Sequence, residues 1–256
     1  MEFFSKLRHF EIADQIIPCL HQCGKKIMEI YSNFNNDIQI KDDNSPITKA
    51  DIASHEIIYN CFKHSNYPII SEESQNIYTN SSKYLLVDPL DGTKEFINRN
   101  GEFTINIALI KNRYPLEGYV YSPTTKTLYL GGLDKKSFKI QNSILKPIHT
   151  SETASPIRIV ASRSHLNEET QKYISQFSKY ELLQSGSSIK FCLVAEGRAD
   201  VYPRFAPTSE WDTAAAQAVV EGAGGFVLDI NGDRLNYQKK NILNPYFIVS
   251  GQLNYS

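Results

Sequence analysis

Two aspartates three residues apart are the first residues in this sequence whose type and spacing could do chemistry. Asp88 and Asp91 end an apolar run within residues 84–96, which read Tyr-Leu-Leu-Val-Asp-Pro-Leu-Asp-Gly-Thr-Lys-Glu-Phe. The run predicts a strand, and the proline and glycine beside the aspartates predict a tight turn at its end. Two negative charges at a buried turn are costly unless a cation joins them, and hard divalent cations prefer oxygen ligands. We therefore predict that these carboxylates, with a carbonyl between them, bind divalent cations.

Gly92 and Thr93, which follow directly, are suited to an anion. Gly92 allows a positive φ and the close approach of a ligand. A helix or turn that starts at Thr93 would aim backbone N–H groups at a phosphate. Together with the aspartates, these residues predict a combined metal and phosphate site. The same residues also fit a strand that ends in an Asx-type turn without a ligand, and this alternative stays open.

Three further acidic residues lie where an element begins or ends. Glu72 ends a second apolar run, residues 68–73, in the same way as the aspartates. Asp212 lies in the first turn of a predicted helix, where the helix dipole keeps a carboxylate ionised. Asp51 leads into another predicted helix. For Asp51 and Asp212, a helix cap or a complement to the dipole is the alternative to a functional role.

Other patterns that carry chemistry are weak in this sequence. It has no His-Glu-x-x-His metal motif and no Gly-x-Ser-x-Gly elbow, and the glycines after residue 221 end a helix where a dinucleotide fingerprint would open one. His165 is the one histidine that we keep as a candidate, because it follows a predicted strand. Cys19 and Cys23 could share a helix face and bind a metal, although buried free thiols are common.

The elements that must position these residues divide the chain into two parts. Residues 13–31 recur at helical spacing, and Pro18 is predicted to kink this helix or to mark its start. A polar stretch at 145–156 predicts a boundary between an α+β part, 1–148, and an α/β part, 149–256. In the second part the pattern predicts strands at 157–161, 180–184, 200–202, 226–229 and 246–250 and helices at 167–178, 187–196 and 211–221.

Composition and charge favour a protein that binds a small ligand. The 256 residues are 41% hydrophobic, enough for a sizeable core, and 27 basic against 28 acidic residues give a net charge of -1. No basic excess indicates a nucleic-acid polymer or a membrane surface as partner. No apolar run approaches the ~20 residues of a membrane helix, and no signal-peptide core is found near the N-terminus. We therefore expect no transmembrane segment and a cytoplasmic location.

Taken together, the acidic motifs resemble those of the inositol monophosphatase superfamily, whose members are metal-dependent, lithium-inhibited phosphatases. The motifs are Glu72-Glu73 after a strand, Asp88-Pro-Leu-Asp-Gly-Thr93, and Trp211-Asp-Thr-Ala-Ala215. They occur in the family's order and span most of the chain. The resemblance implies a layered αβαβα sandwich with two sub-domains and the active site between them.

Finer details resemble the CysQ branch, the 3'(2'),5'-bisphosphate nucleotidases. They are Ser45-Pro-Ile-Thr-Lys-Ala-Asp51, Thr93-Lys-Glu-Phe-Ile97, Asn100-Gly-Glu-Phe-Thr104 and Ala199-Asp-Val-Tyr-Pro-Arg204. The inositol branch tends to carry Thr-Asn-Phe where this chain has Lys-Glu-Phe at 94–96. The resemblance implies a Mg²⁺-dependent enzyme of sulfur metabolism. It would convert adenosine 3',5'-bisphosphate to AMP and also act on the sulfated form. The alternatives are an inositol monophosphatase or broad sugar phosphatase, and a sensor that binds the nucleotide without hydrolysing it.

The resemblance also implies metal-binding and catalytic roles at matching positions. Glu72, Asp88 and the carbonyl of Leu90 would hold one Mg²⁺, and Asp88, Asp91 and Asp212 would hold a second. A third, looser ion would lean on Glu72, a residue that we also count as catalytic. Thr93, oriented by Asp51, would position the attacking water.

The remaining implied roles concern the nucleotide. Backbone N–H groups of Gly92 and Thr93 would contact the reacting phosphate, and residues of the second part would surround the nucleotide and its second phosphate. The substrate-binding set is Glu72, Leu90, Asp91, Gly92, Thr93, Ser164, His165, Ser187, Lys190, Arg204 and Asp212. Whether the protein is a monomer or a homodimer stays open. So do its lithium sensitivity and any peripheral association with the inner face of the cell membrane.

Overall fold

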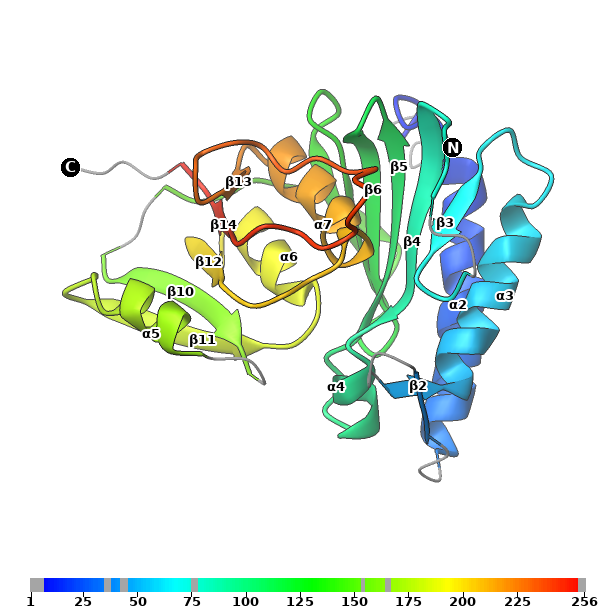
Figure 1. Cartoon of the computed structure of the whole chain (residues 1–256), viewed down its shortest axis with the longest axis horizontal. Helices are drawn as coiled ribbons and strands as arrows, with labels where there is room; N and C mark the ends of the chain where they lie inside the picture. Colours follow the sequence, from blue (N-terminus) through cyan, green and yellow to red (C-terminus); the bar gives the residue numbers. More distant parts are fainter. Residues whose placement is uncertain are drawn as a thin grey trace.

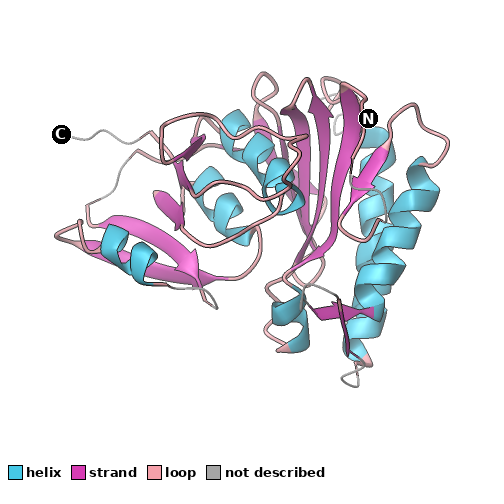
Figure 2. Cartoon of the chain, viewed as in Figure 1, coloured by secondary structure: helices cyan, strands magenta, loops and turns pink. Residues whose placement is uncertain are grey.

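The computed structural model describes residues 7–34, 38–41, 46–74, 78–152, 155–163 and 167–252. Helices and sheets alternate in five layers (Figures 1 and 2). α2 (Ala13–Ser32) and α3 (Lys49–Phe62) cover the outer face of a seven-stranded sheet. α6 (Ile189–Ala195) and α7 (Glu210–Gly222) lie between this sheet and a five-stranded one, whose far face is covered by α5 (Glu168–Ile174). The expected αβαβα sandwich is confirmed.

The two sheets differ in the way they are paired. The first has the order β3-β4-β5-β6-β7-β8-β9, with β3 parallel to β4 and the other pairs antiparallel. Its strands are β3 (Ile69–Ser71), β4 (Lys83–Asp91), β5 (Thr104–Lys111), β6 (Tyr114–Ser122), β7 (Thr127–Gly131), β8 (Ser137–Gln141) and β9 (Ile144–Ile148). The second is mixed, with the order β11-β10-β12-β14-β13. Its strands are β10 (Ile157–Ser162), β11 (Tyr180–Ser185), β12 (Val201–Arg204), β13 (Phe226–Asp229) and β14 (Phe247–Ser250). A short hairpin of β1 (Ile38–Ile40) and β2 (Pro46–Thr48) precedes α3, and α4 (Thr93–Ile97) follows β4.

Strand β4, which ends with Asp88 and Asp91, is buried on both faces. Leu85 and Val87 point into the outer core, under α2 and α3, whereas Leu86 points into the inner core with α7. A strand covered by helices on both sides is expected to be continuously apolar, as this one is. Its C-terminal end, with Asp88, is therefore held firmly in the middle of the molecule.

Helix α7 brings the distant Asp212 to β4 because small residues let it approach the first sheet. A Cβ atom on Gly118 of β6 would lie 2.0 Å from the carbonyl oxygen of Ala215. Ala215 and Ala218 themselves present only methyl groups to the sheet. The helix comes from the second half of the sequence, yet its apolar residues share one core with strands of the first half. The two halves thus meet through α7.

Most predicted elements are present, with three corrections. Residues 144–148 form β9, although their polar composition suggested a boundary. β9 is an edge strand, and an edge tolerates Pro147 and exposed side chains. The helix predicted at 167–178 spans only Glu168–Ile174. Pro18 lies inside α2 and does not mark its start.

Two further expectations concern the membrane and the cysteines. Across the described residues, no helix has both the length and the apolar character needed to span a membrane. All four cysteines are free; Cys19, Cys23 and Cys192 are buried and Cys61 is exposed. Within the described ranges, no thiol belongs to a group of side chains that could hold a metal ion.

Candidate active site

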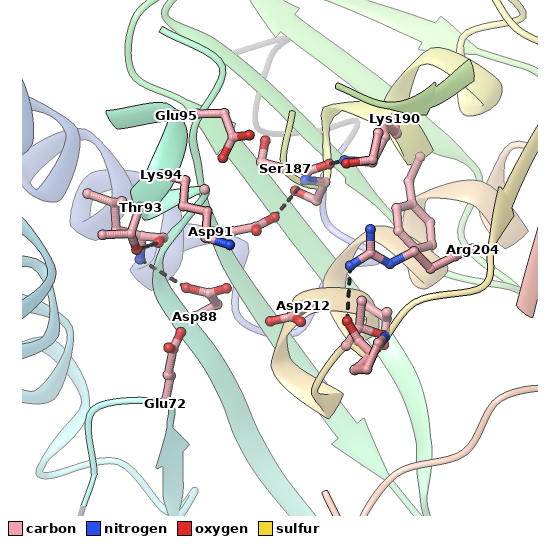
Figure 3. Close-up of a pocket in the computed structure, with 18 of the residues that line it drawn as sticks. Glu72, Asp88, Asp91, Thr93, Lys94, Glu95, Ser187, Lys190, Arg204 and Asp212 are labelled. Carbon is pink, nitrogen blue, oxygen red and sulfur yellow. Dashed lines mark hydrogen bonds between the residues drawn. The ribbon is translucent and has the colours of Figure 1, made fainter. Parts of the chain in front are cut away.

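Most of the predicted site residues line one cavity of about 320 Å³ (Figure 3). Those that line it are Glu72, Asp88, Leu90, Asp91, Gly92, Thr93, Ser187, Lys190, Arg204 and Asp212. They come from both halves of the sequence. Asp51 is buried directly behind Thr93, and Ser164 and His165 lie outside the described residues. The structure thus brings the metal-binding and nucleotide-binding candidates to one place.

Asp88 lies where the pairing of β4 with β5 becomes irregular, between residues 88 and 91. Its Oδ1 accepts a hydrogen bond from the backbone N–H of Leu90 at 3.0 Å, which is the predicted Asx-type turn. The side chain is only 1% exposed. Burial raises the pKa of Asp88 well above its usual range, and the carboxylates of Glu72 and Asp91 raise it further. An Asx-type turn and a metal-binding role for Asp88 are therefore compatible. A cation would stabilise the carboxylate that the turn buries.

Asp91 is fastened by groups from two other segments. Its Oδ2 accepts hydrogen bonds from the backbone N–H of Ser188 at 2.6 Å and from the Asn106 side chain at 3.2 Å. Ser188 in turn donates to Asn106 Oδ1 at 2.8 Å. Burial raises the pKa of Asp91, although the Lys190 ammonium group opposes the shift. One carboxylate oxygen is thus held by protein donors.

Asp51 and Asp212 have the same local arrangement, because each is the third residue of a helix that begins with a capping box. Asp51 Oδ2 accepts from the Thr48 N–H at 2.8 Å, and Asp212 Oδ2 accepts from the Ser209 N–H at 2.8 Å. Burial raises the pKa of Asp212 to about 8, with further contributions from Asp91 and other nearby carboxylates. In both residues one oxygen caps the helix and the other remains for the site. The cap and the functional role are thus not exclusive.

The carboxylate oxygen of Asp51 that does not cap the helix accepts a hydrogen bond from Thr93. Thr93 Oγ1 donates to Asp51 Oδ1 at 3.0 Å, with the carbonyl of Leu90 as a second acceptor at 3.3 Å. Burial raises the pKa of Asp51, and its hydrogen bonds with Thr48 and Thr93 oppose this rise. Because the hydroxyl proton faces Asp51, the lone pairs of Thr93 Oγ1 are directed elsewhere. They are suited to accept a hydrogen bond from a water molecule in the cavity.

Glu72 extends from β3 toward the same cavity, and a lysine that the sequence analysis missed contacts it. Lys41 Nζ lies 2.8 Å from Glu72 Oε1 and 2.5 Å from Glu73 Oε1. Burial raises the pKa of Glu72 and Lys41 lowers it. Lys41 follows strand β1 in a polar segment, so no local pattern could have linked it to Glu72. The ammonium group balances charge at the edge of the carboxylate cluster.

The donor groups of the cavity fit a hard divalent cation. The described lining residues include no cysteine or histidine, whereas Glu72, Asp88, Asp91 and Asp212 supply carboxylates and Leu90 a carbonyl. In the described part of the chain, no three His, Cys, Asp or Glu side chains are already arranged so that they could hold a metal ion. Fastening one oxygen of each aspartate leaves the second available. This oxygen-only set matches the preference of Mg²⁺.

The opposite wall of the cavity is cationic. Lys190 is 5% exposed, and burial lowers its pKa to about 8, although Asp91 opposes the shift. Its Nζ donates to the carbonyl of Ser187 at 2.5 Å. Arg204 donates to the Pro207 carbonyl at 3.0 Å, while its buried Nε has no hydrogen-bond partner among the described residues. This wall therefore retains donor capacity for an anion.

Comparisons with known proteins agree with this arrangement. The model of the inositol monophosphatase family matches residues 11–252. The chain is 43% identical over 246 residues to the 3'(2'),5'-bisphosphate nucleotidase CysQ of Escherichia coli strain K12, covering 93% of this chain and 99% of that protein. It is 39% identical to the protein of the same name from Buchnera aphidicola, covering 98% and 97%. The crystal structure of CysQ from Bacteroides thetaiotaomicron superposes with a TM-score of 0.84 at 39% identity, covering 95% and 98%. An IMPase from Thermotoga maritima shares the fold, with a TM-score of 0.79 at 22% identity and coverage of 95% and 93%.

Proposed function

The chain belongs to the inositol monophosphatase family, and from this premise we propose that it is a 3'(2'),5'-bisphosphate nucleotidase. It is a metal-dependent phosphomonoesterase that removes the 3'-phosphate of adenosine 3',5'-bisphosphate to give AMP and phosphate. It also acts on the sulfated form of this nucleotide. The relatives named 3'(2'),5'-bisphosphate nucleotidase support the substrate, since they match over nearly their whole length. The observation that carries the proposal is a single cavity lined by the carboxylates of Glu72, Asp88, Asp91 and Asp212 together with the cations Lys190 and Arg204.

Two to three Mg²⁺ ions are proposed for the carboxylate wall. Glu72, Asp88 and the carbonyl of Leu90 would hold the first, and Asp88, Asp91 and Asp212 the second; a looser third would lean on Glu72. When bound, such ions lower the pKa of water towards neutrality and offset the charge of the phosphate and of the leaving oxygen. The raised pKa values of these buried acids support the assignment, because a cation would relieve their mutual repulsion.

Thr93 and Asp51 orient the attacking water. Asp51 is held by Thr48 through its Oδ2 and accepts the Thr93 hydroxyl through its Oδ1. A lone pair of Thr93 Oγ1 then accepts a hydrogen bond from a water molecule. This bond directs the oxygen of the water at the phosphorus. Because Asp51 is fixed on both sides, this orientation costs little when the substrate binds. A sensor that only bound the nucleotide would not need this pair.

We propose that the reacting phosphate binds at the start of α4. Gly92 has φ +91°, so it can turn the chain sharply from β4 into the helix. The first N–H groups of a helix have no partner within it and can donate to phosphate oxygens. Gly92 and Thr93 would make these contacts.

The second phosphate is proposed to bind the cationic wall. Lys190 and Arg204 would supply its charge, and Ser187 a hydroxyl; Ser164 and His165 stay predictions outside the described residues. Two cations in the same cavity as the four carboxylates support a substrate with a second phosphate over inositol monophosphate, which has one. Phosphate release measures this choice directly. We expect much faster turnover of adenosine 3',5'-bisphosphate than of inositol 1-phosphate with Mg²⁺, and the reverse order would overturn the nucleotidase assignment.

Three coarser expectations remain proposals. We place the division of the chain at 148/149. This division is supported by the two sheets, since the last strand of the first ends at Ile148 and the first strand of the second begins at Ile157. A cytoplasmic location is supported by four cysteines that are all free thiols. The protein is proposed to be a monomer or a homodimer, which sedimentation distinguishes.

A further inference from the structure

Glu95 is a buried residue of the cavity that neither the metal sites nor the second-phosphate site uses. It lies on α4, is 6% exposed and lines the cavity with Thr93 and Ser187. Figure 3 shows its carboxylate directed into the cavity, on the same side as Ser187. Its place on the cavity lining lets the carboxylate contact a ligand as well as protein groups.

Two glycines from opposite halves of the sequence make room for this side chain. A Cβ atom on Gly186 would lie 2.5 Å from Cγ of Glu95, which is too close for any larger residue to fit without a shift. A Cβ atom on Gly92 would lie 3.2 Å from Oε2 of Glu95 and 3.2 Å from Cβ of Ser187. Gly92, the residue proposed to contact the reacting phosphate, therefore has both the Glu95 carboxylate and Ser187, proposed to contact the nucleotide, as close neighbours.

The charge of Glu95 also acts on both walls. Burial is the main influence on Asp91 and Lys190, raising the pKa of the first and lowering that of the second. The negative charge of Glu95 raises the pKa of both residues. Glu95 thus acts electrostatically on one residue of the carboxylate wall and one of the cationic wall. A group that connected phosphates bound at these two walls would lie in the cavity that Glu95 lines.

In a nucleoside 3',5'-bisphosphate, the connecting group is the ribose. Its one free hydroxyl is the 2'-hydroxyl, on the carbon next to the 3'-ester that is cleaved. An ionised carboxylate accepts hydrogen bonds and repels phosphate, so its suitable partner on this substrate is that hydroxyl. We propose that Glu95 accepts a hydrogen bond from the 2'-hydroxyl and so determines specificity for ribose over 2'-deoxyribose. This inference rests on the proposed nucleotidase function and adds to it a residue that recognises the sugar.

The test compares adenosine 3',5'-bisphosphate with its 2'-deoxy form in wild-type protein, Glu95→Gln and Glu95→Ala. A hydrogen bond to a charged group changes kcat/KM by roughly tenfold or more. We expect wild-type protein to prefer the ribose substrate by about that factor. Glu95→Ala should lose this preference because only the ribose substrate becomes slower, and Glu95→Gln should keep an intermediate preference.

Glu102 provides the matched control. It is another acid beside Gly186, since its Oε2 accepts the Gly186 N–H at 2.8 Å, but it does not line the cavity. Glu102→Gln should keep the wild-type ratio between the two substrates. If Glu95→Ala and Glu95→Gln slow both substrates equally, Glu95 has a structural role and the inference is wrong. Equal turnover of the two substrates by wild-type protein would also overturn it, while leaving the nucleotidase function intact. If wild-type protein hydrolyses neither, the proposed function itself fails, and this inference with it.

Discussion

The two walls of the cavity are built in different ways. Asp88 and Asp212 on the carboxylate wall, and Asp51 behind it, are each fixed by a donor two or three residues away, through a capping box or an Asx turn. On the cationic wall, Lys190 and Arg204 also donate to carbonyls three residues away, but these contacts follow no sequence motif. The Lys190 ammonium group is in addition packed over the Tyr202 ring, 5.4 Å from its centroid. Site residues that a local motif positions can be predicted from the sequence. Site residues that packing positions can be located only once the complete fold is known.

The largest expected effect comes from Asp88→Asn, which should abolish activity on every substrate because Asp88 is assigned to two ions. The same change should stabilise the metal-free protein, since it removes a buried acid whose ionisation is disfavoured by burial and by Glu72 and Asp91. Thermal unfolding in a chelator should show a higher Tm, by roughly 2–4 °C for each kcal/mol gained. A variant that lost both activity and stability would indicate that Asp88 is mainly a structural residue.

Lys190→Met tests the other wall and should affect substrates selectively. With adenosine 3',5'-bisphosphate, kcat/KM should fall by about 10–100-fold, the range for a lost hydrogen bond to a charged group. With adenosine 3'-monophosphate, which lacks the second phosphate, it should change little. Steady-state kinetics on the two substrates provides the comparison. Equal losses would mean that Lys190 supports the carboxylate wall through Asp91 and does not bind the second phosphate.

The sequence predicted the carboxylate wall well for a physical reason. Asp-x-x-Asp-Gly-Thr and the two capping boxes each occupy a few consecutive residues, so their geometry follows from local chain chemistry. By contrast, Ser188 and Asn106, which hold Asp91, come from segments far apart in sequence. Lys41, 31 residues before Glu72, was missed for the same reason. Glu95 lies within the motif at 93–97, but its place in the cavity depends on packing against the distant Gly186. Edge strand β9 was missed because an exposed edge needs no apolar pattern.

Metal binding should depend on pH through the carboxylate wall. Burial and the neighbouring acids Asp91 and Glu72 raise the pKa of Asp212 to about 8, against about 3.9 for an unfolded aspartate. Between pH values of about 3.9 and about 8, the metal-free folded protein therefore binds more protons than the unfolded chain. Its stability falls as the pH rises through this range. Mg²⁺ requires the ionised form, so its binding releases protons and strengthens with pH.

Unfolding scans at pH 6, 7 and 8, with Mg²⁺ and with a chelator, measure this linkage. The increase in Tm caused by Mg²⁺ should be largest at pH 8. An increase that was the same at all three values would show that these carboxylates are already ionised without metal, contrary to the account.

The smallest expected effect concerns the link between helix capping and catalysis. Thr48 donates its hydroxyl to Asp51 at 2.6 Å and accepts the Ala50 N–H at 3.1 Å. Thr48→Ala should cost about 1 kcal/mol of stability and lower kcat by about tenfold, because Asp51 loses part of its support. Thr48→Ser keeps the hydroxyl and serves as the matched control. If the alanine variant lost stability but kept full kcat, capping and catalysis would be independent.

The orientation of the substrate between the walls is the central claim, and product identification tests it most directly. Wild-type protein, Mg²⁺ and adenosine 3',5'-bisphosphate are incubated, and the nucleotide product is identified by ³¹P NMR. The account predicts AMP with its 5'-phosphate and one equivalent of inorganic phosphate, and no reaction in a chelator. Adenosine 3'-monophosphate as the product would contradict it, because the 5'-phosphate would then have occupied the carboxylate wall.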